Sequence, residues 1–120
     1  IRLGGERDVL NVVADQIGTP TNAADLAKAI LTILPKIKNE KVELFHFSNE
    51  GVCSWYDFAK TIFELTDSKI TLNPIDSEHY PTPAKRPYYS VLSKNKIKED
   101  YQIEIPYWRT SLKSMIQTIQ

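Results

Sequence analysis

The stretch that most constrains the fold of this 120-residue chain runs from Val12 to Leu34, where an apolar segment leads into a polar turn and then into a helical pattern. Gly18 in the turn can adopt backbone angles that other residues disfavour, and Pro20 fixes its own φ. Asn22 is a suitable N-cap, with Asp25 three residues on as the acidic partner. The stretch therefore predicts a strand, a turn and a helix, and the apolar face of that helix comprises Leu26, Ala27, Ile30, Leu31 and Leu34.

The turn itself carries four polar side chains, those of Asp15, Gln16, Thr19 and Thr21. They stand where a strand enters a helix, which is the place where α/β proteins put ligand contacts. From this geometry alone, the turn is either a functional loop or an ordinary connection.

The composition limits what the chain can bind. Its 15 basic and 15 acidic side chains cancel, so no long-range field favours nucleic acid or an anionic membrane, and local groups must meet any anionic ligand. No apolar run approaches the roughly 20 residues of a membrane span. Residues 1–7 lack both a starting Met and the apolar core of a signal peptide. We expect one domain, or part of one, cut from a longer protein.

The single cysteine, Cys53, excludes an internal disulfide and fits a reducing compartment. As a nucleophile it would need a base beside it, and neither His46 nor His79 is close in sequence. We expect Cys53 to be a small structural residue. His46 is expected in the core or half-buried rather than as a metal ligand, because no partner stands at a useful spacing.

Two successive strand–helix units are predicted in the first half of the chain. The first strand covers residues 8–13, and the second covers Val42–Ser48, whose apolar residues fall on both faces as in a strand covered on two sides. Ser54, with Asp57 three residues later, forms a capping box that starts the second helix. Strands that alternate with helices indicate an α/β fold.

The second half predicts a short strand at 69–74, a short basic helix at 94–101 capped by Ser93, and a last helix that starts at Pro106. The predicted architecture is an α/β domain with a C-terminal helical section. Its expected buried residues are Leu26, Ile30, Phe45, Phe47, Trp55, Phe58, Ile62, Trp108 and Ile116.

A proline-rich segment stands out between these elements. Three of the seven prolines lie between Pro81 and Pro87, and they hold Lys85 and Arg86 in few conformations. A rigid loop that displays a guanidinium can grip a phosphate with two hydrogen bonds. The alternative is a stiff surface connection with a solvated arginine.

One catalytic pattern is interpreted as a chance match. Tyr56 and Lys60 have the Tyr-x-x-x-Lys spacing of short-chain dehydrogenases, but they fall in the first turn of a helix whose neighbours are expected in the core. Gly4, Gly5, Gly18 and Gly51 are the only glycines, and their spacing gives no dinucleotide fingerprint.

Three segments together resemble the C-terminal portion of the dTDP-4-dehydrorhamnose reductase family, which belongs to the extended short-chain dehydrogenases. They are Asp15–Thr21 (Asp-Gln-Ile-Gly-Thr-Pro-Thr), Phe45–Gly51 and Tyr80–Pro87, in the family's order and at family-like distances. The resemblance covers essentially all 120 residues. It implies that the chain is the substrate-binding portion of a Rossmann-type enzyme whose Rossmann half is missing.

The resemblance implies a cytoplasmic bacterial enzyme that reduces a dTDP-4-keto sugar to dTDP-L-rhamnose for cell-surface polysaccharide. Its N-terminal half would bind NADPH and carry the catalytic Tyr-x-x-x-Lys, so residues 1–120 alone would be inactive. By the resemblance, Arg86 faces the substrate diphosphate and Gln16, Gly18 and Thr21 face the bound dTDP-sugar. No catalytic or cofactor-binding residue is assigned, because the resemblance puts these in the N-terminal half. No metal-binding residue is assigned either, because the acidic residue that some family members have near the C-terminus is absent from 117–120.

Two alternatives stay open. The chain could be a non-catalytic, reductase-like binding or regulatory subunit, or part of another extended short-chain dehydrogenase that acts on a nucleotide-sugar. For the reductase interpretation we expect its own N-terminal Rossmann half as a partner, a possible homodimer, and neither nucleic acid nor membrane. Apolar surface left uncovered by the missing half should cause self-association.

Overall fold

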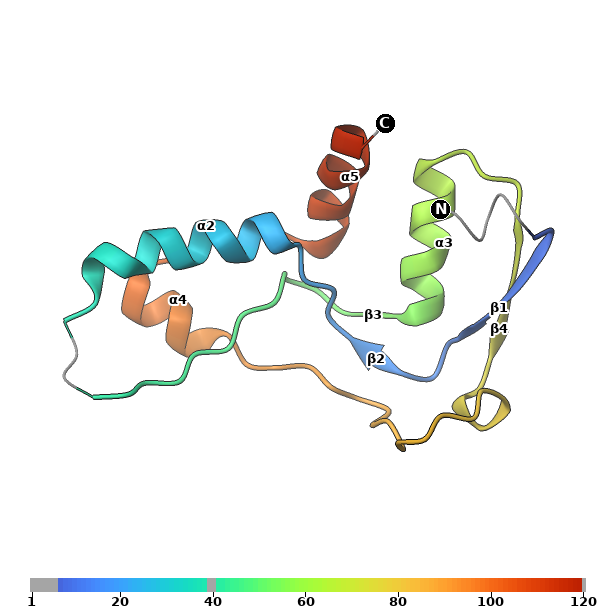
Figure 1. Ribbon diagram of the computed structural model, residues 1–120, viewed down its shortest axis with the longest axis horizontal. Coiled ribbons are helices and arrows are strands. Elements are labelled where there is room, and N and C mark those ends of the chain that lie inside the picture. Colours follow the sequence, from blue (N-terminus) through green and yellow to red (C-terminus); the bar gives the residue numbers. More distant parts are fainter. Residues whose placement is uncertain (1–6, 39–40, 120) are drawn as a thin grey trace.

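Helices and short strands are mixed along the part of the chain that the structure, a computed structural model, describes, namely residues 7–38 and 41–119. This mixture confirms the predicted α/β class. The elements in chain order (Figure 1) are β1 (Val9–Val13), β2 (Ile17–Gly18), α2 (Ala23–Ile33), the 3-10 turn η1 (Leu34–Lys36), β3 (Cys53–Ser54), α3 (Trp55–Leu65), β4 (Thr71–Ile75), the 3-10 turn η2 (Ser77–His79), α4 (Asn95–Tyr101) and α5 (Trp108–Ile119).

Two strand pairs organise the half of the molecule around α3. β1 and β4 run parallel, in a register that extends from Val9 opposite Thr71 to Val13 opposite Ile75. β2 and β3 pair antiparallel through two residues each. The strands expected at 8–13 and 69–74 are thus confirmed, although Pro74 lies inside β4 and does not end it. A proline is tolerated there because each strand of a two-stranded sheet is an edge.

The start of α2 was predicted correctly, but its buried face was not. The Asn22 side chain accepts hydrogen bonds from the backbone N–H groups of Ala24 and Asp25, as expected of an N-cap. Ala29 is the one buried residue of this helix, whereas Ile30 and Leu31 are 47% and 69% exposed. The prediction that the apolar face lies inside is wrong because no described element covers that face.

The second predicted strand, Val42–Ser48, is also wrong. The segment is extended but pairs with no strand among the described residues, and Val42 and Leu44 are exposed. Phe45 is held on α4, where its ring meets the ring of Tyr101 at 5.2 Å and the Nζ of Lys96 at 3.7 Å. His46, expected in the core or half-buried, is exposed.

The last two helices begin later than predicted. α4 begins at Asn95, with Lys94 at the N-cap position, so Ser93 does not cap it. α5 begins at Trp108, two residues after Pro106. The capping box at the start of α3 is confirmed: Ser54 and Asp57 each bond the backbone N–H of the other.

The hydrophobic core lies between α3 and α5 and is small. Cys53, Trp108, Leu112 and Ile116 are buried in it. Of the nine residues predicted to be buried, Trp108 and Ile116 are buried, while Ile30 and Trp55 are exposed. The remaining five are half-buried: Leu26, Phe45, Phe47, Phe58 and Ile62.

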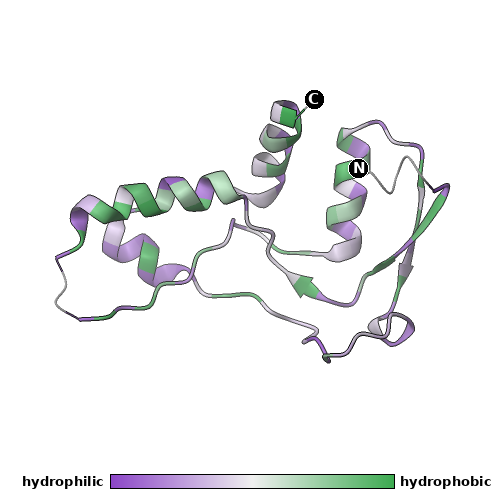
Figure 2. Ribbon diagram, in the orientation of Figure 1, coloured by the Kyte–Doolittle hydropathy of each residue, from purple (hydrophilic) through white to green (hydrophobic). Residues whose placement is uncertain are grey.

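The molecule is more extended than its length requires. Its radius of gyration is 17.0 Å, whereas a compact domain of this length has about 14 Å. Its accessible surface is 8778 Å², against about 6,600 Å² for a compact monomer of this mass. Figure 2 shows hydrophobic residues along α2 and along the extended segment that follows it. The prediction that apolar surface is left uncovered is confirmed.

None of the helices between residues 7 and 119 that the structure describes is both long and apolar enough to cross a lipid bilayer.

The carboxamide of Asn49 connects segments that are distant in sequence. Its Oδ1 accepts from the backbone N–H of Asn22 at 2.7 Å, and its Nδ2 lies 2.6 Å from Asp25 Oδ2, 3.2 Å from the Pro106 carbonyl oxygen and 3.0 Å from Ser111 Oγ. Ser111 Oγ also donates to Asp25 Oδ2 at 2.5 Å. Asn49 is 1% exposed. This one side chain therefore fixes the start of α2 against the start of α5.

We predict that Asn49→Ala lowers the free energy of unfolding by about 3 kcal/mol, because several buried polar groups lose their partner at once. Urea denaturation of the two proteins measures this difference. The control is Asn73→Ala, which removes an exposed amide that bonds Asn11 at 3.4 Å and should change stability by less than about 0.5 kcal/mol. Similar losses in the two variants would contradict a connecting role for Asn49.

Candidate functional site

A cavity of about 330 Å³ lies where three segments of the chain meet. Residues 16–20 form one wall, residues of β3 and the first turn of α3 form another, and the end of the proline-rich segment with Ser90 forms the third. About 300 Å³ is the lower limit for small-molecule sites, so this cavity has room for part of a large ligand.

Ile17 holds the three walls together. Its backbone N–H donates to the Tyr88 carbonyl at 2.8 Å, and its own carbonyl accepts from the Ser90 N–H at 2.9 Å. On its other side Ile17 is the residue of β2 that pairs with Ser54 of β3. Segments that are more than 30 residues apart in sequence therefore meet at Ile17 through ordinary backbone pairing.

The polar turn before α2 is also bonded to the turn that begins the proline-rich segment. The backbone N–H and the hydroxyl of Ser77 both donate to the Asp15 carboxylate, the hydroxyl at 2.6 Å. Gln16 Nε2 donates to Ser77 Oγ at 2.8 Å. The hydrogen bond from the Ser77 hydroxyl, followed by that from its backbone, lowers the pKa of Asp15. The carboxylate is therefore ionised at neutral pH and anchors the segment that leads to Arg86.

Three of the four residues predicted to face a substrate meet at this cavity. Gln16, Gly18 and Arg86 line it. Arg86 is exposed and has no hydrogen-bond or ion-pair partner between residues 7 and 119 as the structure describes them. A Cβ at Gly18 would lie 3.2 Å from Ser90 Oγ, so the wall leaves little room for a larger residue. Thr21 is exposed and does not line the cavity.

Sequence reasoning missed Trp55 and Cys53 as parts of this cavity. Trp55, expected in the core, is 58% exposed on the cavity wall. The sequence did contain a signal for Trp55. This residue directly follows the predicted N-cap Ser54, so it lies at the end of its helix, where a side chain is more readily left exposed. Cys53 is buried, as a small structural residue should be, and burial together with the Asp57 charge raises the pKa of its thiol to about 11. The thiol is therefore neutral and unreactive at neutral pH.

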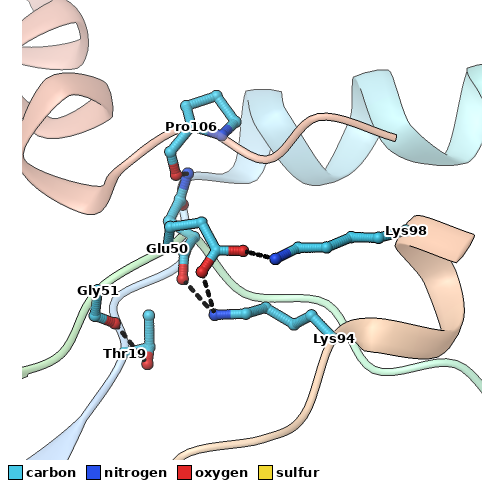
Figure 3. Close-up of polar contacts among 7 residues, drawn as sticks. Thr19, Glu50, Gly51, Lys94, Lys98 and Pro106 are labelled. Carbon is cyan, nitrogen blue, oxygen red and sulfur yellow. Dashed lines mark hydrogen bonds and ion pairs between the residues drawn. The ribbon is translucent and has the colours of Figure 1, made fainter. Parts of the chain in front are cut away.

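A charged cluster supports the turn that borders the cavity (Figure 3). Lys94, only 8% exposed, donates from Nζ to the Asn49 carbonyl at 3.0 Å and lies 3.4 Å from Glu50 Oε2. Lys98 pairs with the other carboxylate oxygen of Glu50. The hydrogen bond from Lys98 is the main cause that lowers the pKa of Glu50, and the nearby charge of Lys94 adds to it.

Gly51 joins this cluster to the cavity wall. Its carbonyl accepts from Thr19 Oγ1 at 3.0 Å, and Thr19 lines the cavity (Figure 3). Gly51 has φ +84°, and a Cβ there would clash with the ring of Tyr107. The turn therefore requires glycine for both its backbone angle and its close packing.

No three His, Cys, Asp or Glu side chains within the described ranges 7–38 and 41–119 are arranged to hold a metal ion.

We predict that Glu50→Gln lowers the free energy of unfolding by about 1 kcal/mol at pH 7, a modest value because the carboxylate is partly exposed. The folded-state pKa of Glu50 lies below its ordinary 4.5, so the contribution is full above that value and is lost as the pH falls through the folded pKa. The difference from the wild type should therefore shrink as the pH falls below 4.5.

Urea denaturation at several pH values measures this effect. Glu64→Gln is the matched control, because Glu64 pairs at 3.1 Å with Arg109 on the exposed surface and should contribute less than about 0.5 kcal/mol. A Glu50→Gln deficit that does not change with pH over the whole acid range in which the protein folds would contradict the assigned charge interaction.

The comparisons with known proteins point to one family. The model of the RmlD substrate binding domain family matches residues 1–120. A dTDP-4-dehydrorhamnose reductase from Sinorhizobium fredii is 37% identical over 124 residues, which cover 97% of this chain and 42% of that relative. The chain thus spans about two-fifths of the length of the curated relatives it matches.

Two solved structures have the same fold. The crystal structure of a dTDP-4-dehydrorhamnose reductase from Clostridium acetobutylicum superposes with a TM-score of 0.89 at 41% identity and covers 99% of this chain and 41% of its own. The reductase from Bacillus anthracis, solved in complex with NADP, superposes with a TM-score of 0.84 at 36% identity and the same coverage.

Proposed function

This chain belongs to the RmlD substrate binding domain family, and we propose that residues 1–120 form the sugar-nucleotide-binding domain of an NADPH-dependent dTDP-4-dehydrorhamnose reductase. The observation that carries the proposal is the convergence of Gln16, Gly18 and Arg86 on one cavity. The reductase name printed for the relatives supports it. The product would be dTDP-L-rhamnose for cell-surface polysaccharide.

Arg86 is the residue that we assign to the substrate diphosphate. A chain with no net charge attracts an anion only through local groups, and two phosphates are best held by charge-assisted hydrogen bonds from a guanidinium. Arg86 has no protein partner that would compete in the described part of the chain, and Pro87 beside it also lines the cavity. The prolines reduce the conformational entropy lost when the ligand is bound.

We assign NADPH to another part of the enzyme. A dinucleotide needs a glycine-rich turn whose backbone approaches the pyrophosphate. Of the two glycines that the structure describes, Gly18 faces Ser90 and Gly51 faces the rings of Tyr107 and Trp108. Neither belongs to a glycine-rich turn of this kind, so the described residues do not fit the cofactor. NADPH bound to the Rossmann half would supply the hydride, and that half would carry the tyrosine that protonates the new alkoxide.

The uncovered apolar surface supports a partner of this kind. Ile30, Leu31 and Leu34 on the α2 side, with Val42 and Leu44, are large apolar residues left in water. We propose that the Rossmann half of the same protein covers this surface, with a homodimer as a further possibility. The free, buried Cys53 agrees with a cytoplasmic location.

We predict that Arg86→Ala in the complete reductase weakens dTDP binding by about 2–4 kcal/mol, the range for removing one partner of a charge pair. Arg86→Lys should recover part of this loss, because an ammonium cannot form the two-pronged contact. Calorimetric titration with dTDP measures both. The control is Lys85→Ala, a neighbouring cation outside the cavity lining, which should bind normally. Unchanged dTDP affinity in Arg86→Ala would show that the proline-rich segment is a surface connection without a role in binding.

We also predict that residues 1–120 alone show no NADPH oxidation with the sugar nucleotide, whereas the complete reductase does. In the complete enzyme, Tyr56→Phe should leave the rate unchanged, because the Tyr56–Lys60 spacing is a chance match. Turnover by the isolated chain would make Tyr56 and Lys60 catalytic candidates again. A complete protein that binds dTDP but never turns over would favour a non-catalytic binding subunit.

A further inference from the structure

The segment that carries Arg86 is attached to the rest of the molecule at few points. Residues 78–90 are all exposed, so no buried side chain of their own holds them in place. The hydrogen bonds that join residues 77–90 to other described segments all end on Asp15, Gln16 or Ile17. The position of Arg86 beside the cavity therefore depends on these few polar attachments.

The two ends of this segment are attached in different ways. At its C-terminal end the attachment is backbone pairing, because the Ile17 N–H donates to the Tyr88 carbonyl at 2.8 Å and the Ser90 N–H donates to the Ile17 carbonyl at 2.9 Å. At its N-terminal end the Asp15 carboxylate accepts from the Ser77 hydroxyl at 2.6 Å and from the Ser77 N–H at 3.0 Å. Only the N-terminal attachment depends on the identity of a side chain, that of Asp15.

Asp15 caps the turn η2 in place of the residue at the N-cap position. Asp76 occupies that position, but its side chain forms no capping hydrogen bond. The first N–H of the turn, that of Ser77, donates instead to Asp15, which is 62 residues away in sequence. A carboxylate that accepts a free N–H at the start of a helical turn stabilises that turn. The direction in which the chain leaves β4 is thus set by Asp15.

The Ser77 hydroxyl extends the same constraint to Gln16. Its single proton is donated to Asp15, so toward Gln16 the hydroxyl can only accept. The Gln16 amide is therefore held with its Nε2 toward Ser77, at 2.8 Å. Gln16 lines the cavity, whereas Asp15 and Ser77 do not. Asp15 thus acts on the residues that line the cavity without lining it itself.

The chain between Ser77 and Arg86 is stiff enough to transmit a displacement. The three prolines in residues 81–87 restrict its backbone, and Thr82 Oγ1 donates to the Ala84 carbonyl at 2.7 Å. Proline-rich segments behave as semi-rigid spacers. If the attachment at Ser77 were lost, the segment could rotate about its C-terminal attachment, and the guanidinium would move away from the cavity.

We propose that Asp15 is a positioning residue for anion binding, because through Ser77 it fixes the segment that presents Arg86 to the diphosphate of the sugar nucleotide. This inference rests on the proposed function and deepens it. Its expected effect is opposite in sign to that of simple electrostatics. Removal of a negative charge near an anion site should strengthen anion binding, whereas removal of the attachment that orients the guanidinium should weaken it.

The test measures binding of dTDP and of inorganic diphosphate to the complete reductase by calorimetric titration. Asp15→Ala should weaken both ligands about fivefold or more, and Asp15→Asn, which keeps one acceptor oxygen but no charge, should lie between. Ser77→Ala should also weaken both ligands, whereas Ser77→Thr keeps the hydroxyl and should retain most of the affinity. The control is Asp76→Asn, which removes an exposed carboxylate beside Ser77 and should bind within about twofold of the wild type.

A double-mutant cycle tests whether Asp15 acts through Arg86. In the Arg86→Ala background, Asp15→Ala should cause a much smaller loss of dTDP affinity than it causes in the wild type, because the guanidinium that it positions is already absent. A loss of the same size in both backgrounds would show that Asp15 acts by another route and would overturn the proposal.

The outcomes separate this proposal from the proposed function. If Arg86→Ala weakens both ligands but Asp15→Ala binds them unchanged or more tightly, the positioning role is overturned and the proposed site stands. If Arg86→Ala leaves dTDP binding unchanged, the proposed site itself is overturned. If Asp15→Ala does not fold, the two Ser77 variants decide the question, because equal dTDP affinities in Ser77→Ala and Ser77→Thr would overturn the positioning role.

Discussion

The carboxamide of Asn49 is the interaction on which the arrangement of the helices depends. It bonds the backbone at the start of α2 and the carbonyl and hydroxyl at the start of α5. The next residue extends the connection, because Glu50 N–H donates to the Pro106 carbonyl and the Glu50 carbonyl accepts from Trp108 N–H, each at 2.9 Å. The turn is thus bonded to α5 through both side chain and backbone.

The same turn sets the geometry of the cavity. Gly51 follows Glu50 and accepts from Thr19, and Cys53 then begins the strand that pairs with β2. A small core makes this polar network important: where few apolar side chains are buried together, a satisfied buried network supplies much of what fixes one conformation. Lys98 of α4 and Lys94 just before it add charge to the turn, so α2, α4 and α5 all meet at Asn49 and Glu50 (Figure 3).

Local chemistry explains which elements could be predicted. The caps at Asn22 and Ser54 and the strand in 8–13 depend on neighbouring residues, so the sequence reveals them. The network around Asn49 could not be found in this way, because Asp25 and Ser111 lie 24 and 62 residues from it. The meeting of Gln16 and Arg86 followed from motif resemblance, not from periodicity. Thr21, in the same motif, lies outside the cavity lining.

The burial errors have a common physical cause that also bears on function. An apolar side chain in a helical pattern shows that a surface should be covered, but it does not show by what. The prediction assumed that the chain covers itself, and for Trp108 and Ile116 it does. For Ile30, Val42 and Trp55 nothing in the described chain does, in a molecule with about a third more surface than a compact monomer. Trp55 lines the cavity, where a ligand can cover it, whereas Ile30 and Val42 lie outside that lining and form surface that a second domain can cover.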